Sequence, residues 1–148
     1  MELLTKQYGT INYDKEEIIE FRKGLPGFED LKNFLLFPVE ENNIFYVLHS
    51  IENTYIGFIV VSPFDFIKDY EFKIEDEKLK ELNISSQEEV KIFNIVTLNS
   101  KFQKTTVNLK APIIINTKLK LGEQIIIDNE KYFIKHPLFK EGSYACDN

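Results

Sequence analysis

Residues 45–61 read FYVLHSIENTYIGFIVV, and this stretch decides the fold class. Two runs rich in β-branched and aromatic residues, at 45–50 and 55–61, flank the turn-forming pair Glu52-Asn53. Two such runs joined by a short polar connection are typical of a β-hairpin. The centre of the chain is therefore predicted to form part of a sheet.

The same pattern continues on both sides of this hairpin, where short apolar segments alternate with Gly, Pro, Asn and Asp turns. Further strands are expected at 3–8, 18–21, 34–37, 70–74, 90–98, 105–109, 113–116, 124–127 and 132–134. Short helices are expected at 29–33 and at 76–82, the second with Asp76 as N-cap, and the Ser86-x-x-Glu89 pattern predicts one further helical turn. We predict a mainly β single domain over 1–138, a sandwich or a distorted, partly closed β-barrel with one or two short helices, followed by a polar C-terminal tail at 139–148.

Composition narrows the function classes. The 148 residues include one cysteine and two histidines, and 18 basic residues stand against 24 acidic ones. This inventory argues against a disulfide framework and a zinc site, and we predict no catalytic residue, cofactor or metal. No run approaches the roughly 18 apolar residues of a membrane-spanning helix, and the N-terminus has no signal-peptide pattern, so a cytoplasmic location is expected. Cys146 has no predicted role.

Charge is unevenly distributed along the chain. Residues 65–89 contain nine acids and four lysines, a net charge of −5, whereas 99–122 contain five lysines and no acid. Both segments could be solvated faces that keep the domain soluble. Alternatively, the acidic segment could receive a basic partner, in which case binding would depend on salt.

Two other function classes use the same residues. Asp65, Asp69 and Glu71 could in principle form the carboxylate pair of a small hydrolase, although spacing alone is weak evidence. A nucleic-acid-binding β-barrel could use the lysines of 99–122, but Phe102 is the only aromatic residue there and the chain is net acidic. We expect no direct nucleic-acid binding, and we interpret His49 and His136 as structural or solvent-facing.

Six ordered blocks carry a family resemblance. They are IIEFRKGLPGFEDLKNFLLF (18–37), GFIVVSPFDFIKDYEFKI (57–74), VKIFNIVTL (90–98), TTVNLKAPIIINTK (105–118), GEQIII (122–127) and YFIKHPL (132–138). In this order they resemble the flagellar assembly factor FliW family. The most specific pieces are the GLPGF turn at 24–28, the PF…DYEF block at 63–72 and NLxAP at 108–112.

The resemblance implies a non-enzymatic bacterial protein with two partners, flagellin and the RNA-binding translational regulator CsrA. It implies that the protein sequesters CsrA when free of flagellin, which relieves repression of flagellin translation, and releases CsrA when flagellin occupies it.

Partner-binding residues are expected in and after the PF…DYEF block. An acidic face for basic CsrA is expected at Asp65, Asp69, Glu71, Glu75 and Asp76, and exposed apolar residues for flagellin at Phe64, Phe66, Ile67 and Tyr70. For Phe66 and Tyr70, core packing explains the residue at least as well. In the GLPGF turn, Gly24, Pro26 and Gly27 are expected to set the backbone conformation rather than to contact a partner.

Overall fold

The computed structural model describes residues 1–40 and 44–139. It contains eleven strands, one α-helix and four 3-10 helices in these residues. In chain order they are β1 (Glu2–Leu4), β2 (Thr10–Asn12), η1 (Lys15–Glu17), β3 (Ile19–Glu20), β4 (Asn33–Pro38), β5 (Phe45–Ser50), β6 (Gly57–Val61), η2 (Pro63–Asp65), α1 (Asp76–Glu81), η3 (Gln87–Glu89), β7 (Val90–Thr97), η4 (Phe102–Lys104), β8 (Thr106–Val107), β9 (Ile113–Asn116), β10 (Leu121–Gln124) and β11 (His136–Pro137). The mainly β prediction is confirmed.

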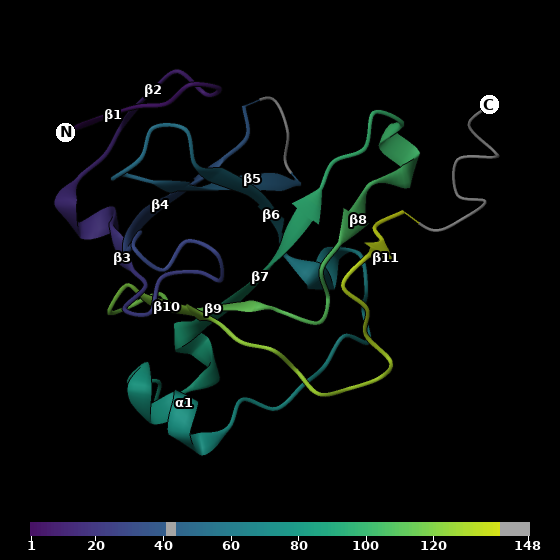
Figure 1. Cartoon of the computed structure of the whole chain (residues 1–148). Coiled ribbons are helices and arrows are strands. Elements are labelled where there is room, and N and C mark those ends of the chain that lie inside the picture. Colours follow the sequence, from purple (N-terminus) through teal and green to yellow (C-terminus); the bar gives the residue numbers. More distant parts are fainter. Residues whose placement is uncertain (41–43, 140–148) are drawn as a thin grey trace.

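Nine strands form one strongly curved sheet, in the order β11-β8-β7-β6-β5-β4-β3-β10-β9 (Figure 1). The sheet bends back on itself because the long strand β7 also pairs with β9. Closure is only partial, since β3 and β10 meet through the single parallel pair Leu121 and Glu20. The sheet is therefore a partly closed ring and not a complete barrel. β1 and β2 form a separate two-stranded ribbon.

Successive side chains along each strand point to opposite faces of the sheet. Phe93 and Ile95 of β7 belong to a core to which β3, β4, β5, β6 and β9 also contribute, so this core fills the inside of the curve. Ile92 and Val96 point the other way, where two further apolar clusters lie under residues 66–84 and 125–139. The chain after β6 thus covers the outer face of the sheet.

Two predicted elements are wrong: the strand at 70–74, which lies in this covering stretch, and the helix at 29–33, which lies just before β4. Residues 70–74 form no strand; they run extended without a sheet partner because Tyr70, Phe72 and Ile74 pack on the outer face of the sheet instead. Residues 29–33 form no helix: residues 29 and 30 lie in a turn and Asn33 already begins β4. The Glu52 carboxylate accepts hydrogen bonds from the backbone N–H of Lys32 and of Asn33, which holds this stretch at the start of the strand.

Several predicted strands are displaced. The strand expected at 124–127 lies at Leu121–Gln124, and the last strand is His136–Pro137 rather than 132–134. The strand expected at 3–8 is confined to Glu2–Leu4, and Thr10–Asn12 was not predicted. The helix expected at 76–82 is present at Asp76–Glu81 with Glu75 at its N-cap, and the Ser86 capping box is confirmed. Of the predicted tail, only Phe139 lies in the described residues, where its ring packs against Phe66 and Phe102.

Candidate docking groove

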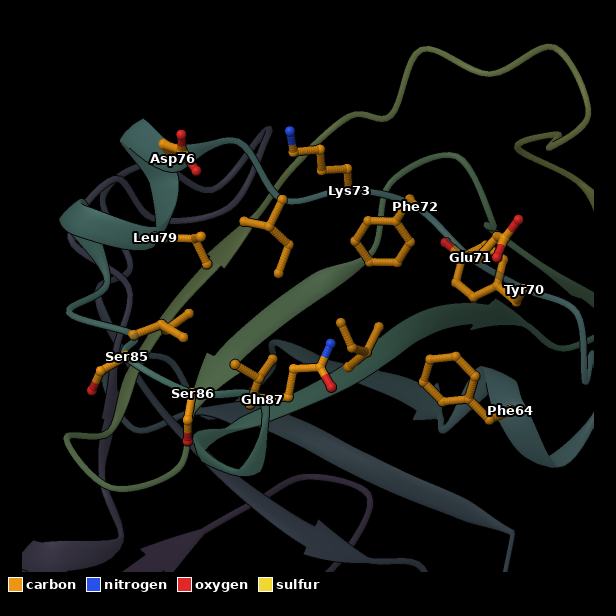
Figure 2. A pocket seen from close by; sticks show the side chains of 14 residues that line it. Phe64, Tyr70, Glu71, Phe72, Lys73, Asp76, Leu79, Ser85, Ser86 and Gln87 are labelled. Carbon is orange, nitrogen blue, oxygen red and sulfur yellow. The ribbon is translucent and has the colours of Figure 1, made fainter.

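An open groove of about 740 Å³ lies on the outer face, between the extended stretch 70–74, helix α1 and the start of β7 (Figure 2). Its lining comprises Phe64, Tyr70, Glu71, Phe72, Lys73, Ile74, Asp76, Leu79, Ile84, Ser85, Ser86, Gln87, Val90 and Ile92. We call this the docking groove. Half of these residues are apolar side chains that are only partly buried or exposed, so the groove offers an apolar floor to a partner.

The alternation of residues 70–74 builds one wall of the groove. Phe72 and Ile74 are half-buried and pack on the sheet, whereas Glu71 and Lys73 are exposed. In Figure 2, Phe72 and Leu79 point into the hollow, and Lys73 and Asp76 stand at its rim. The stretch therefore places apolar side chains inside and charged groups around them.

Tyr70 fixes this wall to the sheet. Its side chain is 3% exposed, and its hydroxyl donates a hydrogen bond to the Leu109 carbonyl at 2.6 Å and accepts one from the Asn94 amide at 3.2 Å. Burial raises the pKa of Tyr70 to about 12. The expectation that Tyr70 is an exposed contact residue is therefore wrong, and the alternative of core packing holds.

Helix α1 forms the opposite wall and is tied to the sheet by ionic contacts. Lys78 of α1 forms a salt bridge with Glu123 of β10, and both Lys78 and Lys23 contact Glu81, at 3.2 and 3.3 Å. The hydrogen bond to Glu123 is the largest of the effects that raise the pKa of Lys78, and Lys78 in turn lowers the pKa of Glu81. Leu82 after the helix is buried against β9 and β10, so the helix is anchored at both its apolar and its charged side.

The end of the groove is lined by Ser85, Ser86 and Gln87, in a turn that Glu89 stabilises. The Glu89 carboxylate accepts hydrogen bonds from the Ser85 hydroxyl and from the backbone N–H of Ser85 and Ser86, at 2.8 to 3.0 Å. These bonds, with that of the Ser85 hydroxyl first, lower the pKa of Glu89. They define the turn that leads into β7.

A second, smaller hollow of about 350 Å³ shares Phe64, Val90 and Ile92 with the docking groove. Its remaining lining is Tyr46, Ser62, Asp65, Lys91 and Phe93. Phe64, with 46% of its surface exposed, stands where the two hollows join. We call this second hollow the strand-edge hollow.

The predicted site residues divide between these hollows and the surface around them. Phe64, Tyr70, Glu71 and Asp76 line the docking groove, and Asp65 lines the strand-edge hollow. Ile67, Asp69 and Glu75 line neither. All five predicted acidic residues are exposed, and Asp69 forms a salt bridge of 3.3 Å with Lys131 that raises the lysine pKa.

The basic segment does not form a single face. Lys101 and Lys104 flank the tip of the β7–β8 hairpin, whereas Lys118 and Lys120 lie in the turn between β9 and β10 (Figure 1). Of the nine acids of the acidic segment, Glu71 and Asp76 line the docking groove and Asp65 lines the strand-edge hollow.

The GLPGF turn has the expected backbone. Gly24 and Gly27 have φ of +66° and +85°, conformations that other residues resist, and Pro26 is exposed. A β-carbon at Gly24 would also lie 2.6 Å from the Glu29 Cα, so this position excludes a side chain for two reasons.

Sequence reasoning missed the floor and the far wall of the groove, which come from Leu79, Ile84, Val90 and Ile92. The i, i+2 spacing of Val90 and Ile92 indicates that they share one face of a strand, but not that this face remains partly uncovered.

Within residues 1–40 and 44–139, no group of three His, Cys, Asp or Glu side chains is arranged to hold a metal ion. No helix of the described chain is long and apolar enough to cross a membrane.

Comparisons with known proteins agree on one family. The family model described as "FliW protein" matches residues 2–138. The flagellar assembly factor FliW of Clostridium novyi (strain NT) is 59% identical over 142 residues, which cover 96% of this chain and 99% of that protein. Its counterpart in Clostridium kluyveri (strain ATCC 8527) is 56% identical over 146 residues, covering 99% of this chain and 100% of that one.

A solved structure is similar throughout. The crystal structure of the flagellar assembly factor FliW superimposes with a TM-score of 0.90 at 36% sequence identity, and the match covers 96% of this chain and 99% of the other.

Proposed function

The chain belongs to the FliW family of flagellar assembly factors, and on this basis we propose that it binds flagellin and sequesters a CsrA-type translational regulator. In this proposal the free protein withholds the regulator from flagellin mRNA and thereby relieves repression. Flagellin that accumulates occupies the protein and releases the regulator. Such a switch consumes no substrate and needs no catalytic residue, and it operates in the cytoplasm, where translation takes place.

The observation that carries the proposal is the docking groove, an apolar floor bordered by the acidic segment 65–89. The partly exposed Phe64, Phe72 and Leu79 offer the kind of surface that accepts the apolar face of a helix. The terminal regions of flagellin are unpaired before assembly and carry such faces. This fit supports flagellin as a partner of the groove.

The acidic residues support the second partner. Asp65, Asp69, Glu71, Glu75 and Asp76 are all exposed, and the segment that contains them has a net charge of −5. An RNA-binding regulator must present cationic surface, so opposite charges would steer its encounter with this protein and orient the complex. Glu71 and Asp76 also border the docking groove, which brings the two proposed surfaces close together.

The experiment that tests the proposal is a set of titrations with the purified partners. The protein is titrated with flagellin and with the CsrA-type regulator of the same bacterium, and the second titration is repeated at increasing salt. A translation reaction programmed with flagellin mRNA then reports the consequence. We expect the regulator to repress this reaction, the protein to restore it, and added flagellin to repress it again.

The proposal is contradicted if neither partner binds. It is also contradicted if both bind but the protein leaves translational repression unchanged. Family membership alone favours the assembly-factor interpretation over the hydrolase and nucleic-acid-binding alternatives, and tight RNA binding that survives moderate salt would reverse that preference.

A further inference from the structure

Strand β7 has a free edge over its first half. On one side, Val90–Phe93 pairs with β9; on the other side, β7 pairs with β6 only at Asn94 and Ile95. The pairing with β6 stops where the chain leaves the sheet after Val61. The first half of β7 therefore has one strand neighbour among the described residues, and not two.

The hydrogen-bonding direction along β7 identifies the groups on this free edge. The Thr117 N–H donates to the Glu89 carbonyl at 2.8 Å, so Glu89, Lys91 and Phe93 direct their backbone groups to β9. The N–H and C=O of Ile92 consequently point to the opposite edge, together with the C=O of Val90, whose own N–H donates to Gln87. No hydrogen bond from a described residue reaches the N–H or C=O of Ile92 on that edge.

The sequence of β6 explains why this edge remains open. When the register of Val61 with Asn94 is continued, Pro63 falls opposite Ile92. Proline has no N–H to donate to a ladder, and here it begins the 3-10 helix η2 instead. The chain leaves the ladder here, although η2 stays near β7. The strand-edge hollow of about 350 Å³ is lined on one side by Ser62, Phe64 and Asp65 and on the other by residues of Val90–Phe93.

We propose that this edge accepts an extended basic peptide, which adds to the sheet as a further strand beside Val90–Phe93. In this mode the backbone of the peptide pairs with Ile92 and Val90, and its side chains alternate between two environments. One set reaches the docking groove beside Phe64 and Ile92, and the other reaches Tyr46 and Phe93 in the strand-edge hollow.

Charge defines the peptide more closely. The charged residues that line the two hollows are three acids, Asp65, Glu71 and Asp76, and two lysines, Lys73 and Lys91, and the 65–89 segment as a whole has a net charge of −5. A strand in which lysine or arginine alternates with an apolar residue matches both the apolar floor and the acidic surroundings. The inference rests on the proposed function only in taking this surface as a docking surface, and it does not depend on which partner supplies the peptide.

The test uses the intact protein and a short synthetic peptide of alternating lysine and valine, with blocked ends. Calorimetry measures its dissociation constant, and amide hydrogen exchange measured by NMR reports on Ile92. We expect the Ile92 amide to exchange freely in the protein alone and to become protected when the peptide is added. A fully N-methylated copy of the peptide, which cannot form a strand ladder, should bind at least about tenfold more weakly.

Two protein variants separate edge pairing from side-chain contact. Ile92→Pro removes the N–H that faces the free edge, whereas Ile92→Ala removes most of the same side chain and keeps that N–H. We expect the proline variant to bind the peptide at least about tenfold more weakly than the alanine variant does. If the proline variant fails to fold, the N-methylated peptide carries the same comparison with the wild-type protein.

Several results would overturn the inference. These are equal binding of the N-methylated peptide, equal binding of the two variants, and equal binding of a peptide of alternating glutamate and valine. An Ile92 amide that is already protected in the free protein also refutes it: protection that depends on concentration assigns the edge to a second copy, and constant protection assigns it to this chain itself. Because the test uses neither flagellin nor the regulator, its failure and the failure of the proposed function are distinguishable.

Discussion

Replacing Phe64 by alanine should weaken flagellin binding without unfolding the protein. The ring lies where the docking groove joins the strand-edge hollow, and 46% of the residue is exposed. A fully buried phenylalanine covers roughly 200 Å², so a partner that seals the ring covers about 90 Å² more. At about 25 cal/mol per Å² this burial contributes about 2 kcal/mol, equivalent to about thirtyfold in the dissociation constant.

Phe102 provides a matched control for this substitution. It is 48% exposed, but it lies in η4 at the tip of the β7–β8 hairpin and lines neither hollow. Calorimetric titration with flagellin should therefore show a loss for Phe64→Ala and little change for Phe102→Ala, with thermal melting confirming that both variants fold. Equal losses for the two variants, or a larger loss for Phe102→Ala, would refute the assignment of the groove.

Three further predictions concern charge, the GLPGF turn and pH. Asp69→Lys combined with Glu71→Lys should weaken binding of the CsrA-type regulator and make that binding less dependent on salt, as titrations across a salt series would show. The melting curve should stay nearly unchanged because both side chains are exposed. Gly24→Ala should lower the free energy of unfolding by more than the roughly 1 kcal/mol expected for Gly27→Ala, since both have positive φ but only Gly24 faces close backbone atoms; urea unfolding measures both. Burial lowers the pKa of His136 below its ordinary 6.5, so the unfolded chain binds a proton at this imidazole more readily than the folded chain does. The free energy of unfolding should therefore fall as the pH falls from 6.5 through the folded-state pKa. Urea unfolding of His136→Gln should show a smaller fall over the same pH range.

Each of these has a contradicting result. Unchanged affinity of the charge-reversed protein for the regulator, with a normal melting curve, would show that Asp69 and Glu71 are not part of the binding surface. Equal unfolding free energies for the two glycine variants would show that the neighbouring backbone at Gly24 yields at little cost. An identical pH dependence in the wild type and the His136 variant would mean that other groups govern acid stability.

The sequence predicted the sheet well because local patterns carry most of its signal. The hairpin of β5 and β6 follows from two β-branched runs around a polar turn, and the positive φ of Gly24 and Gly27 follows from the residue type in a tight turn. The strand predicted at 70–74 is wrong, yet Tyr70, Phe72 and Ile74 do pack on the sheet while Glu71 and Lys73 are exposed. Alternation alone does not reveal whether an extended segment pairs with a neighbouring strand or packs across a sheet.

What could not be predicted depends on contacts between distant residues. The anchoring of α1 requires Lys78 to contact Glu123, and the burial of Tyr70 requires the Leu109 carbonyl to accept a hydrogen bond from its hydroxyl. The free edge at Ile92 results from the register between β6 and β7, which places Pro63 opposite it. Such pairings are set by the packed sheet as a whole, and a single sequence gives no signal for them.

The most direct test of binding to both partners is to recover the tagged protein from its own bacterium, at low and then at moderate salt, and to identify what accompanies it by mass spectrometry. We expect flagellin and the CsrA-type regulator, with the regulator lost more readily as salt rises and flagellin reduced for Phe64→Ala but not for Phe102→Ala. Recovery of RNA or an unrelated enzyme in place of both proteins would contradict this expectation.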